Sequence, residues 1–164
     1  MLESIYIENF AIIDRLEVDF LNHMTVLTGE TGAGKSIIID AIGQLMGNRS
    51  QTSFIKAGKD ECFIEGVFTI AKNSPVLAKL KEFRIEFDDK LVVSKSFNRD
   101  NRTVIKINYR NVSKMVLQSI MSELIDIHSQ FETHSLFDSN NHLDILNHFI
   151  GSSIESLNKQ YSLA

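Results

Sequence analysis

The chain has 164 residues, of which 43% are hydrophobic, and a formal net charge of −4 at pH 7. This length allows one substantial core. Its apolar runs fall short of the roughly 20 residues that span a membrane, and Met1-Leu2-Glu3-Ser4 lacks the pattern of a signal peptide. The net charge does not indicate general nucleic-acid binding, so such a contact must be local. A single cysteine, Cys62, cannot form an internal disulfide and suits a reducing cytoplasm.

Two stretches near the start alternate apolar and polar residues, which is typical of strands in a half-exposed sheet. In residues 2–8, Ile5 and Ile7 fall on one face. Residues 15–20 alternate in the same way, so we expect an antiparallel sheet at the start of the chain.

The apolar run 24–28 predicts a buried strand that leads into a glycine-rich loop. The loop has the phosphate-binding pattern G-x-x-x-x-G-K-[ST], here Gly29-Glu30-Thr31-Gly32-Ala33-Gly34-Lys35-Ser36. Glycines let the backbone curl with its N–H groups inward, and the following helix adds its positive end. Lys35 is expected to contact the β- and γ-phosphates and Ser36 to hold Mg²⁺. Nucleotide contacts are expected from Gly29 to Ile37.

Residues 36–46 predict a helix that leaves this loop and is buried on most sides, because its apolar residues form a broad stripe. Asp40 and Gln44 are its polar positions, with satisfied buried polar groups as the simplest interpretation. Gly47 is a natural helix end.

The remaining elements follow from the same patterns. In chain order we expect a strand over 62–70, a helix over 74–83, strands over 91–97 and 103–109 joined by a hairpin, a helix over 113–124, a short strand over 124–128 and helices over 140–149 and 153–164. Since the last helix has no stop signal, we expect the natural chain to continue beyond it.

A phosphate-loop ATPase also needs an acidic residue, at the end of an apolar strand, to hold Mg²⁺ and position water. Asp126 is the candidate, but only two apolar residues precede it. We therefore expect the catalytic acid to lie outside this chain.

A local basic cluster stands out on this acidic chain. It comprises Lys95, Arg99, Arg102, Lys106 and Arg110. A hairpin with these side chains could contact DNA phosphates, with Arg99 and Arg102 as candidates. An ordinary solvent-facing sheet surface explains the spacing equally well.

Four stretches carry a resemblance to a known family. They are Ile7-Glu8-Asn9-Phe10-Ala11-Ile12-Ile13-Asp14, residues 27–41, Gly47-Asn48-Arg49-Ser50 and Asp126-Ile127-His128-Ser129-Gln130-Phe131-Glu132. Over residues 1 to about 150 the chain resembles the RecN family of bacterial DNA repair proteins. That family is similar to the structural-maintenance-of-chromosomes (SMC) proteins, whose ATP-binding-cassette (ABC) head is split by a long coiled coil.

The resemblance implies an α/β fold of the P-loop NTPase class: an ABC-type ATPase head lobe with an N-terminal antiparallel β subdomain and a mixed sheet. Residues 1–152 would form the N-terminal lobe and 153–164 the start of the coiled coil. Gln130 would occupy the Q-loop position and contact Mg²⁺ or the attacking water. Arg49 would stand where related heads carry a DNA- or phosphate-contacting arginine, although an ordinary surface arginine is the simpler alternative.

The resemblance also implies partners and a function. The chain would bind ATP and Mg²⁺ in a cytoplasmic, nucleoid-associated ATPase for double-strand-break repair and recombination. Hydrolysis would require the C-terminal half of the same head and a second head, which sandwich ATP, and DNA ends or single strands would be the substrate. Two alternatives remain: a self-contained phosphotransferase that uses Asp126, and a non-catalytic DNA-binding module.

Overall fold

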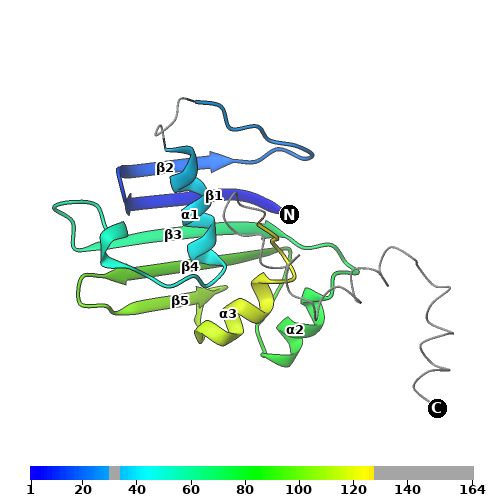
Figure 1. Cartoon of the computed structure of the whole chain (residues 1–164). Coiled ribbons are helices and arrows are strands. Elements are labelled where there is room, and N and C mark those ends of the chain that lie inside the picture. The colour runs from blue at the N-terminus through cyan, green and yellow to red at the C-terminus, as the bar shows by residue number, and fades with distance from the viewer. Residues whose placement is uncertain (30–33, 128–164) are drawn as a thin grey trace, which may run out of the picture. The chain divides into compact units, whose positions relative to one another are not determined.

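The computed structural model describes residues 1–29 and 34–127 (Figure 1). The chain divides into two compact units, Met1–Asp126 and Ile127–Ala164. The expected helices over 140–149 and 153–164, and with them the boundary after residue 152, lie outside the described residues and stay predictions. In the two described ranges, no helix has the length and apolar character needed to cross a bilayer.

The first unit contains a six-stranded sheet, three α-helices and one 3₁₀ turn. In chain order these are β1 (Leu2–Phe10), β2 (Ile13–Asp19), α1 (Lys35–Leu45), η1 (Thr52–Phe54), β3 (Glu61–Thr69), α2 (Val76–Glu82), β4 (Lys90–Asn98), β5 (Thr103–Ile107), β6 (Arg110–Asn111) and α3 (Lys114–Met121). The strand order is β2-β1-β3-β4-β5-β6, and every pairing among the described strands is antiparallel (Figure 1). The predicted antiparallel β subdomain is therefore present.

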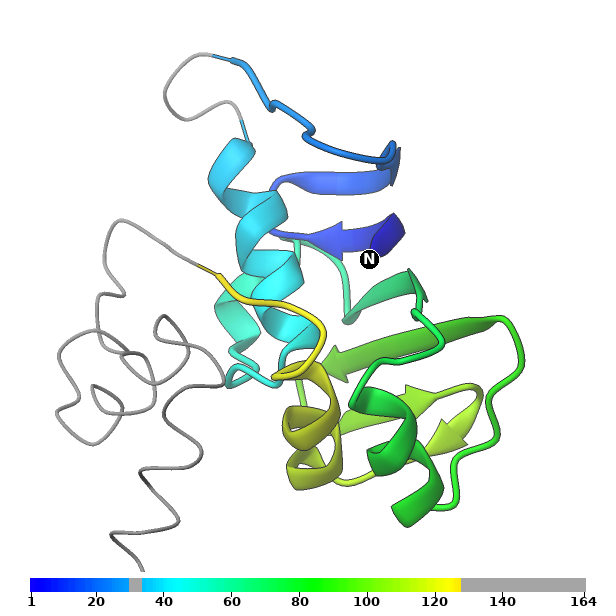
Figure 2. The ribbon, with the colours of Figure 1, turned by 90° about the vertical axis from the view of Figure 1, so that its right-hand side faces the viewer.

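One face of this sheet is the core. Alternate residues of each strand point to that face, as in Ile5 and Ile7 of β1 and Leu91 and Val93 of β4, which are all fully buried. Helices α1 and α3 lie on the same side of the sheet, α1 over β3 and β4 and α3 over β5 (Figure 2). The alternation that predicted the strands is therefore the pattern that builds the core.

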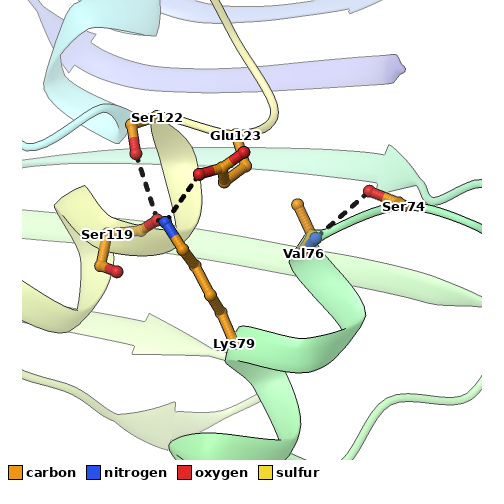
Figure 3. A network of polar contacts seen from close by, with 6 residues as sticks. All are labelled: Ser74, Val76, Lys79, Ser119, Ser122 and Glu123. Carbon is orange, nitrogen blue, oxygen red and sulfur yellow. Dashed lines mark hydrogen bonds and ion pairs between the residues drawn. The ribbon is translucent and has the colours of Figure 1, made fainter. Parts of the chain in front are cut away.

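Helices α2 and α3 are joined by a small polar network (Figure 3). Lys79 Nζ donates to the Ser119 carbonyl at 2.7 Å and to Glu123 Oε1 at 2.8 Å. Ser122 Oγ donates to the same carbonyl at 3.1 Å, and Ser74 Oγ accepts from Val76 N at the start of α2. The lysine therefore gives a second donor to a carbonyl in the last turn of α3, where the backbone N–H donors of the helix run out.

Two predicted strands are wrong. Residues 24–28 form no strand, and Met24 and Val26 are 83% and 65% exposed. A strand needs a hydrogen-bonded neighbour, and none of the six described strands pairs with this run. Residues 124–127 form no strand either, because the N–H groups of Leu124 and Ile125 bond back to the Met121 carbonyl.

The end of the second β-hairpin also differs from prediction. Asn108 and Tyr109, expected in a strand, have φ of 45° and 66° and form the two-residue turn between β5 and β6. Such turns need positive φ at both positions, which asparagine tolerates well. The Asn108 side chain fixes the turn by accepting from Val92 N and donating to the Glu86 carbonyl.

Candidate nucleotide-binding site

The phosphate loop leads directly into α1. Gly34 precedes the helix with φ 90°, a left-handed conformation that favours glycine, and its carbonyl accepts from Ile37 N and Ile38 N at 3.1 and 3.3 Å. Lys35 is the first residue of α1, and its ammonium donates to the Gly29 carbonyl. This bond joins the two ends of the loop, whose middle residues, Glu30 to Ala33, lie outside the described residues.

The sheet holds α1, and therefore the loop, in place. Ala41 and Leu45 on one side of α1 are fully buried. The helix approaches β3 at Gly66, where a Cβ atom would come within 2.8 Å of Leu45 Cδ1. An alanine here would force the Leu45 or Phe68 side chain to shift, so the glycine of β3 lets the second half of α1 pack closely against the strand.

The predicted burial of α1 on most sides is only partly correct. Its first half is half-buried or exposed, with Ile39 45% exposed and Asp40 also exposed. Gln44 is buried, as expected for a satisfied polar group, and its Oε1 accepts from Lys95 Nζ at 2.9 Å. Among the described elements, α1 packs chiefly against β3 and β4, and its buried residues, Ala41, Gly43, Gln44 and Leu45, all lie in its second half.

The described ends of the loop bear on the predicted phosphate contacts. Among the described residues, no atom lies within 4 Å of the position that a Cβ on Gly34 would take. The exposed Ser36 hydroxyl lies one residue into α1, and the Lys35 ammonium bonds only to a neutral carbonyl among the described residues. Within the described ranges, no group of three or more His, Cys, Asp and Glu side chains could hold a metal.

The structure does not gather every predicted site residue. Gln130, predicted to hold Mg²⁺ and take part in catalysis, lies outside the described residues. Asp126 is exposed and lies in irregular chain after α3, so it lacks the strand on which the alternative phosphotransferase reading depends. Arg49 is exposed directly after α1. The Arg99 guanidinium donates to the carbonyls of Lys59 and Lys56 at 2.7 and 3.3 Å.

The basic cluster is not one surface. Lys95 shares the inward face of β4 with Val93 and Phe97 and is 2% exposed, so it is not a solvent-facing residue. Lys106 lies on the opposite face of the sheet, since its β5 neighbours Ile105 and Ile107 point inward. Lys95 falls in step with the apolar residues Val93 and Phe97 of β4, and this spacing was the signal in the sequence that Lys95 is buried.

Residues 4–163 match the protein-family model described as an AAA domain. The chain belongs to the AAA domain family. The family match includes both the antiparallel sheet and the phosphate-loop motif.

The relatives confirm the resemblance seen in the motifs. The chain is 40% identical over 162 residues to DNA repair protein RecN of Bacillus subtilis and to that of Halalkalibacterium halodurans. Each match covers 98% of this chain but only 28% and 29% of the respective relative. The chain thus spans less than a third of the length of these relatives.

Solved structures confirm the class of fold. One, described as "Structural biochemistry of ATP-driven dimerization and DNA stimulated activation of SMC ATPases", has a TM-score of 0.64 and 20% sequence identity. The match covers 76% of this chain and 80% of that chain. The first unit therefore has the fold of an SMC-type ABC ATPase head lobe.

Two glycines allow the loop conformation to be tested. Gly34→Ala is expected to weaken ATP binding about tenfold, because alanine at φ 90° is strained by about 1.4 kcal/mol and relaxes by moving the loop amides. Gly58→Ala is the matched control: its φ is 80°, and it too has no atom within 4 Å of a new Cβ. Isothermal titration calorimetry should show unchanged ATP affinity for Gly58→Ala. Equal losses in both variants would mean that Gly34 has no special role.

Proposed function

We propose that this chain is the ATP-binding N-terminal part of the head of a RecN-like DNA repair ATPase. The observation that carries the proposal is the left-handed Gly34 followed by Lys35 at the start of α1, inside a complete phosphate-loop motif. The 40% identity to proteins named DNA repair protein RecN supports the biological role.

The roles of the site residues follow from their chemistry. The backbone N–H groups between Gly29 and Ile37 cradle the phosphates, and the Lys35 ammonium exchanges the Gly29 carbonyl for β- and γ-phosphate oxygens. The phosphate is the better partner, because its negative charge attracts the ammonium and the carbonyl oxygen of Gly29 carries no net charge. Ser36 and Gln130 supply oxygen ligands to Mg²⁺.

Hydrolysis in this proposal needs regions that the relatives have and this chain does not cover. The missing region is the C-terminal half of the head, which carries the catalytic acid. Hydrolysis also needs a second head, which closes over ATP. The exposed run 24–28 supports this, because its apolar side chains suit a strand that gains its neighbour from another part of the head. The similar SMC structure is described in terms of ATP-driven dimerization.

DNA is the proposed substrate of the whole protein, as double-strand ends or single strands, in the cytoplasm at the nucleoid. Arg49, Arg99 and Arg102 are the candidate contacts in this chain. The exposed side chains of Arg49 and Arg102 make no ion pair among the described residues, whereas Arg99 also braces the loop at Lys56 and Lys59. Of the three arginines, Arg49 and Arg102 are therefore the stronger candidates to bind DNA phosphates.

The proposal is tested by measuring ATP binding and ATP turnover on the same protein. We expect calorimetry to show binding of Mg²⁺-ATP and a phosphate-release assay to show negligible turnover. Asp126→Asn is expected to change neither, because Asp126 lies on no strand. Turnover at the rate of an intact ATPase, lost in Asp126→Asn, would instead establish the self-contained phosphotransferase.

A further inference from the structure

A hollow of about 590 Å³ lies beside the loop that follows α1. Its walls come from that loop, from β4 and β5 and from the start of α3. Since α1 has 11 residues, the hollow is at the opposite end of the helix from the phosphate loop, about 16 Å along its axis. It is therefore a separate feature from the nucleotide site.

The lining of this hollow carries positive charge only. Arg49, Lys95 and Lys114 contribute cationic side chains, and none of the described residues that line it is acidic. The other polar lining groups are neutral, among them the side-chain amides of Asn98 and Asn101. Cations and neutral amide donors without a carboxylate form a surface that attracts anions.

Lys95 is the unusual member of this set. It is 2% exposed, and its Nζ donates to Gln44 Oε1 at 2.9 Å and to the Asn48 carbonyl at 2.7 Å. It has no ion pair in the part of the chain that the structure describes. Burying an ammonium group without a counter-ion is costly. Burial, together with repulsion from Lys114, accordingly lowers its pKa from 10.5 to about 8.

A purely structural role accounts for only part of this arrangement. The Gln44 and Asn48 acceptors use two of the three ammonium donors, which leaves one N–H for a further partner. The Phe97 ring, 5.9 Å from Nζ, adds a cation–π contact but no negative charge. A bound anion would supply both the acceptor and the counter-charge that the described residues do not.

We propose that the hollow binds the phosphate group of a phosphorylated ligand, with Lys95 as its floor and Arg49 and Lys114 as its rim. Phosphate matches the site because its oxygens accept several charge-assisted hydrogen bonds at once. The group can belong to a nucleic-acid backbone or to a free phosphorylated molecule, since both present the same oxygens. The proposal does not depend on ATP binding at the phosphate loop.

The first test is an NMR titration with sodium pyrophosphate on the Lys35→Ala variant, in which binding at the phosphate loop is expected to be about 100-fold weaker. We expect amide shifts at Asn48 to Ser50 and at Lys114, and at least tenfold weaker binding in a protein that also carries Lys95→Met. Lys106→Met is the matched control, because Lys106 is an exposed lysine on the opposite face of the sheet. Shifts that are absent at the hollow, or that persist in Lys95→Met, would overturn the proposal.

The pH dependence of sulfate binding keeps the proposal testable if Lys95→Met does not fold. Sulfate keeps a constant charge between pH 7 and 9, whereas a lysine with a pKa of about 8 loses its proton there. Arg49, Lys114 and Cys62 are the charged or titratable groups around it, and burial raises the pKa of Cys62 to about 12, so that thiol stays neutral. We expect about tenfold weaker binding at pH 9 than at pH 7. Equal affinity at both pH values would contradict a role for Lys95.

A second titration identifies the source of the phosphate. This titration uses a 12-base-pair DNA duplex in place of pyrophosphate. If Lys95→Met loses DNA affinity, and the slope of log affinity against log salt concentration becomes smaller by about 0.9 for each lost phosphate contact, the hollow binds a nucleic-acid backbone. Unchanged DNA affinity, with pyrophosphate binding lost, assigns it to a free phosphorylated molecule. Failure of both ligands to shift the residues of the hollow refutes the site while leaving the proposed ATP function untouched.

Discussion

Lys35→Ala is expected to weaken binding of Mg²⁺-ATP about 100-fold. The ammonium is the positive side chain of the phosphate loop, and a hydrogen bond to a charged group contributes up to about 3 kcal/mol, which is roughly a factor of 100 in affinity. In the structure this ammonium donates to the Gly29 carbonyl, so it already lies across the loop where a phosphate would bind. Isothermal titration calorimetry with ATP measures the effect directly.

The control for this experiment is Lys81→Ala, which removes an exposed lysine in the last turn of α2. We expect it to bind ATP like the parent protein. Both variants should melt at the parent temperature, because neither side chain contributes to the core. An unchanged affinity in Lys35→Ala would mean that the loop does not grip a triphosphate.

Much of the first unit could be predicted from the sequence, because alternation reports which face of a strand is buried. The faces of β1 and β2 and the hairpin of β4 and β5 follow from it, and Ser113 accepts from Val116 N at the predicted start of α3. These features depend on residues close together in the chain. The start of α1 after Gly34 could be predicted for the same reason, since the loop motif itself specifies it.

The failures have a common physical cause. The apolar run 24–28 has the composition of a buried strand, but a strand also needs a neighbouring strand to bond with and to cover it. Composition alone does not show whether such a neighbour is present. The predicted burial of the first half of α1 is wrong for the same reason. Lys95 is the opposite case: a charged residue that the chain does bury, because Gln44 and Asn48 from a distant segment accept hydrogen bonds from its ammonium. Pairings between distant segments are not visible in local patterns.

The contact between α1 and β3 offers the largest stability effect. Leu45 is fully buried, and Leu45→Ala is expected to lower the free energy of unfolding by about 3 kcal/mol through lost burial and the cavity left behind. Gly66→Ala should cost about 2 kcal/mol by overpacking, because its Cβ would lie 2.8 Å from Leu45 Cδ1 and 3.1 Å from Phe68 Cε2. Urea unfolding of each variant measures both values.

The double variant Leu45→Ala/Gly66→Ala shows whether this contact sets the distance between α1 and the sheet. Shortening Leu45 removes the atom that the new Cβ would strike, so we expect the double variant to be more stable than the sum of the two losses predicts, by about 1 kcal/mol or more. Leu80→Ala/Gly66→Ala is the matched control, since Leu80 is a buried leucine of α2 and is not among the nearest atoms to a Cβ at position 66. Its two losses should simply add. Additivity in both pairs would show that α1 is held in register by other contacts, and that the position of the phosphate loop does not depend on the glycine of β3.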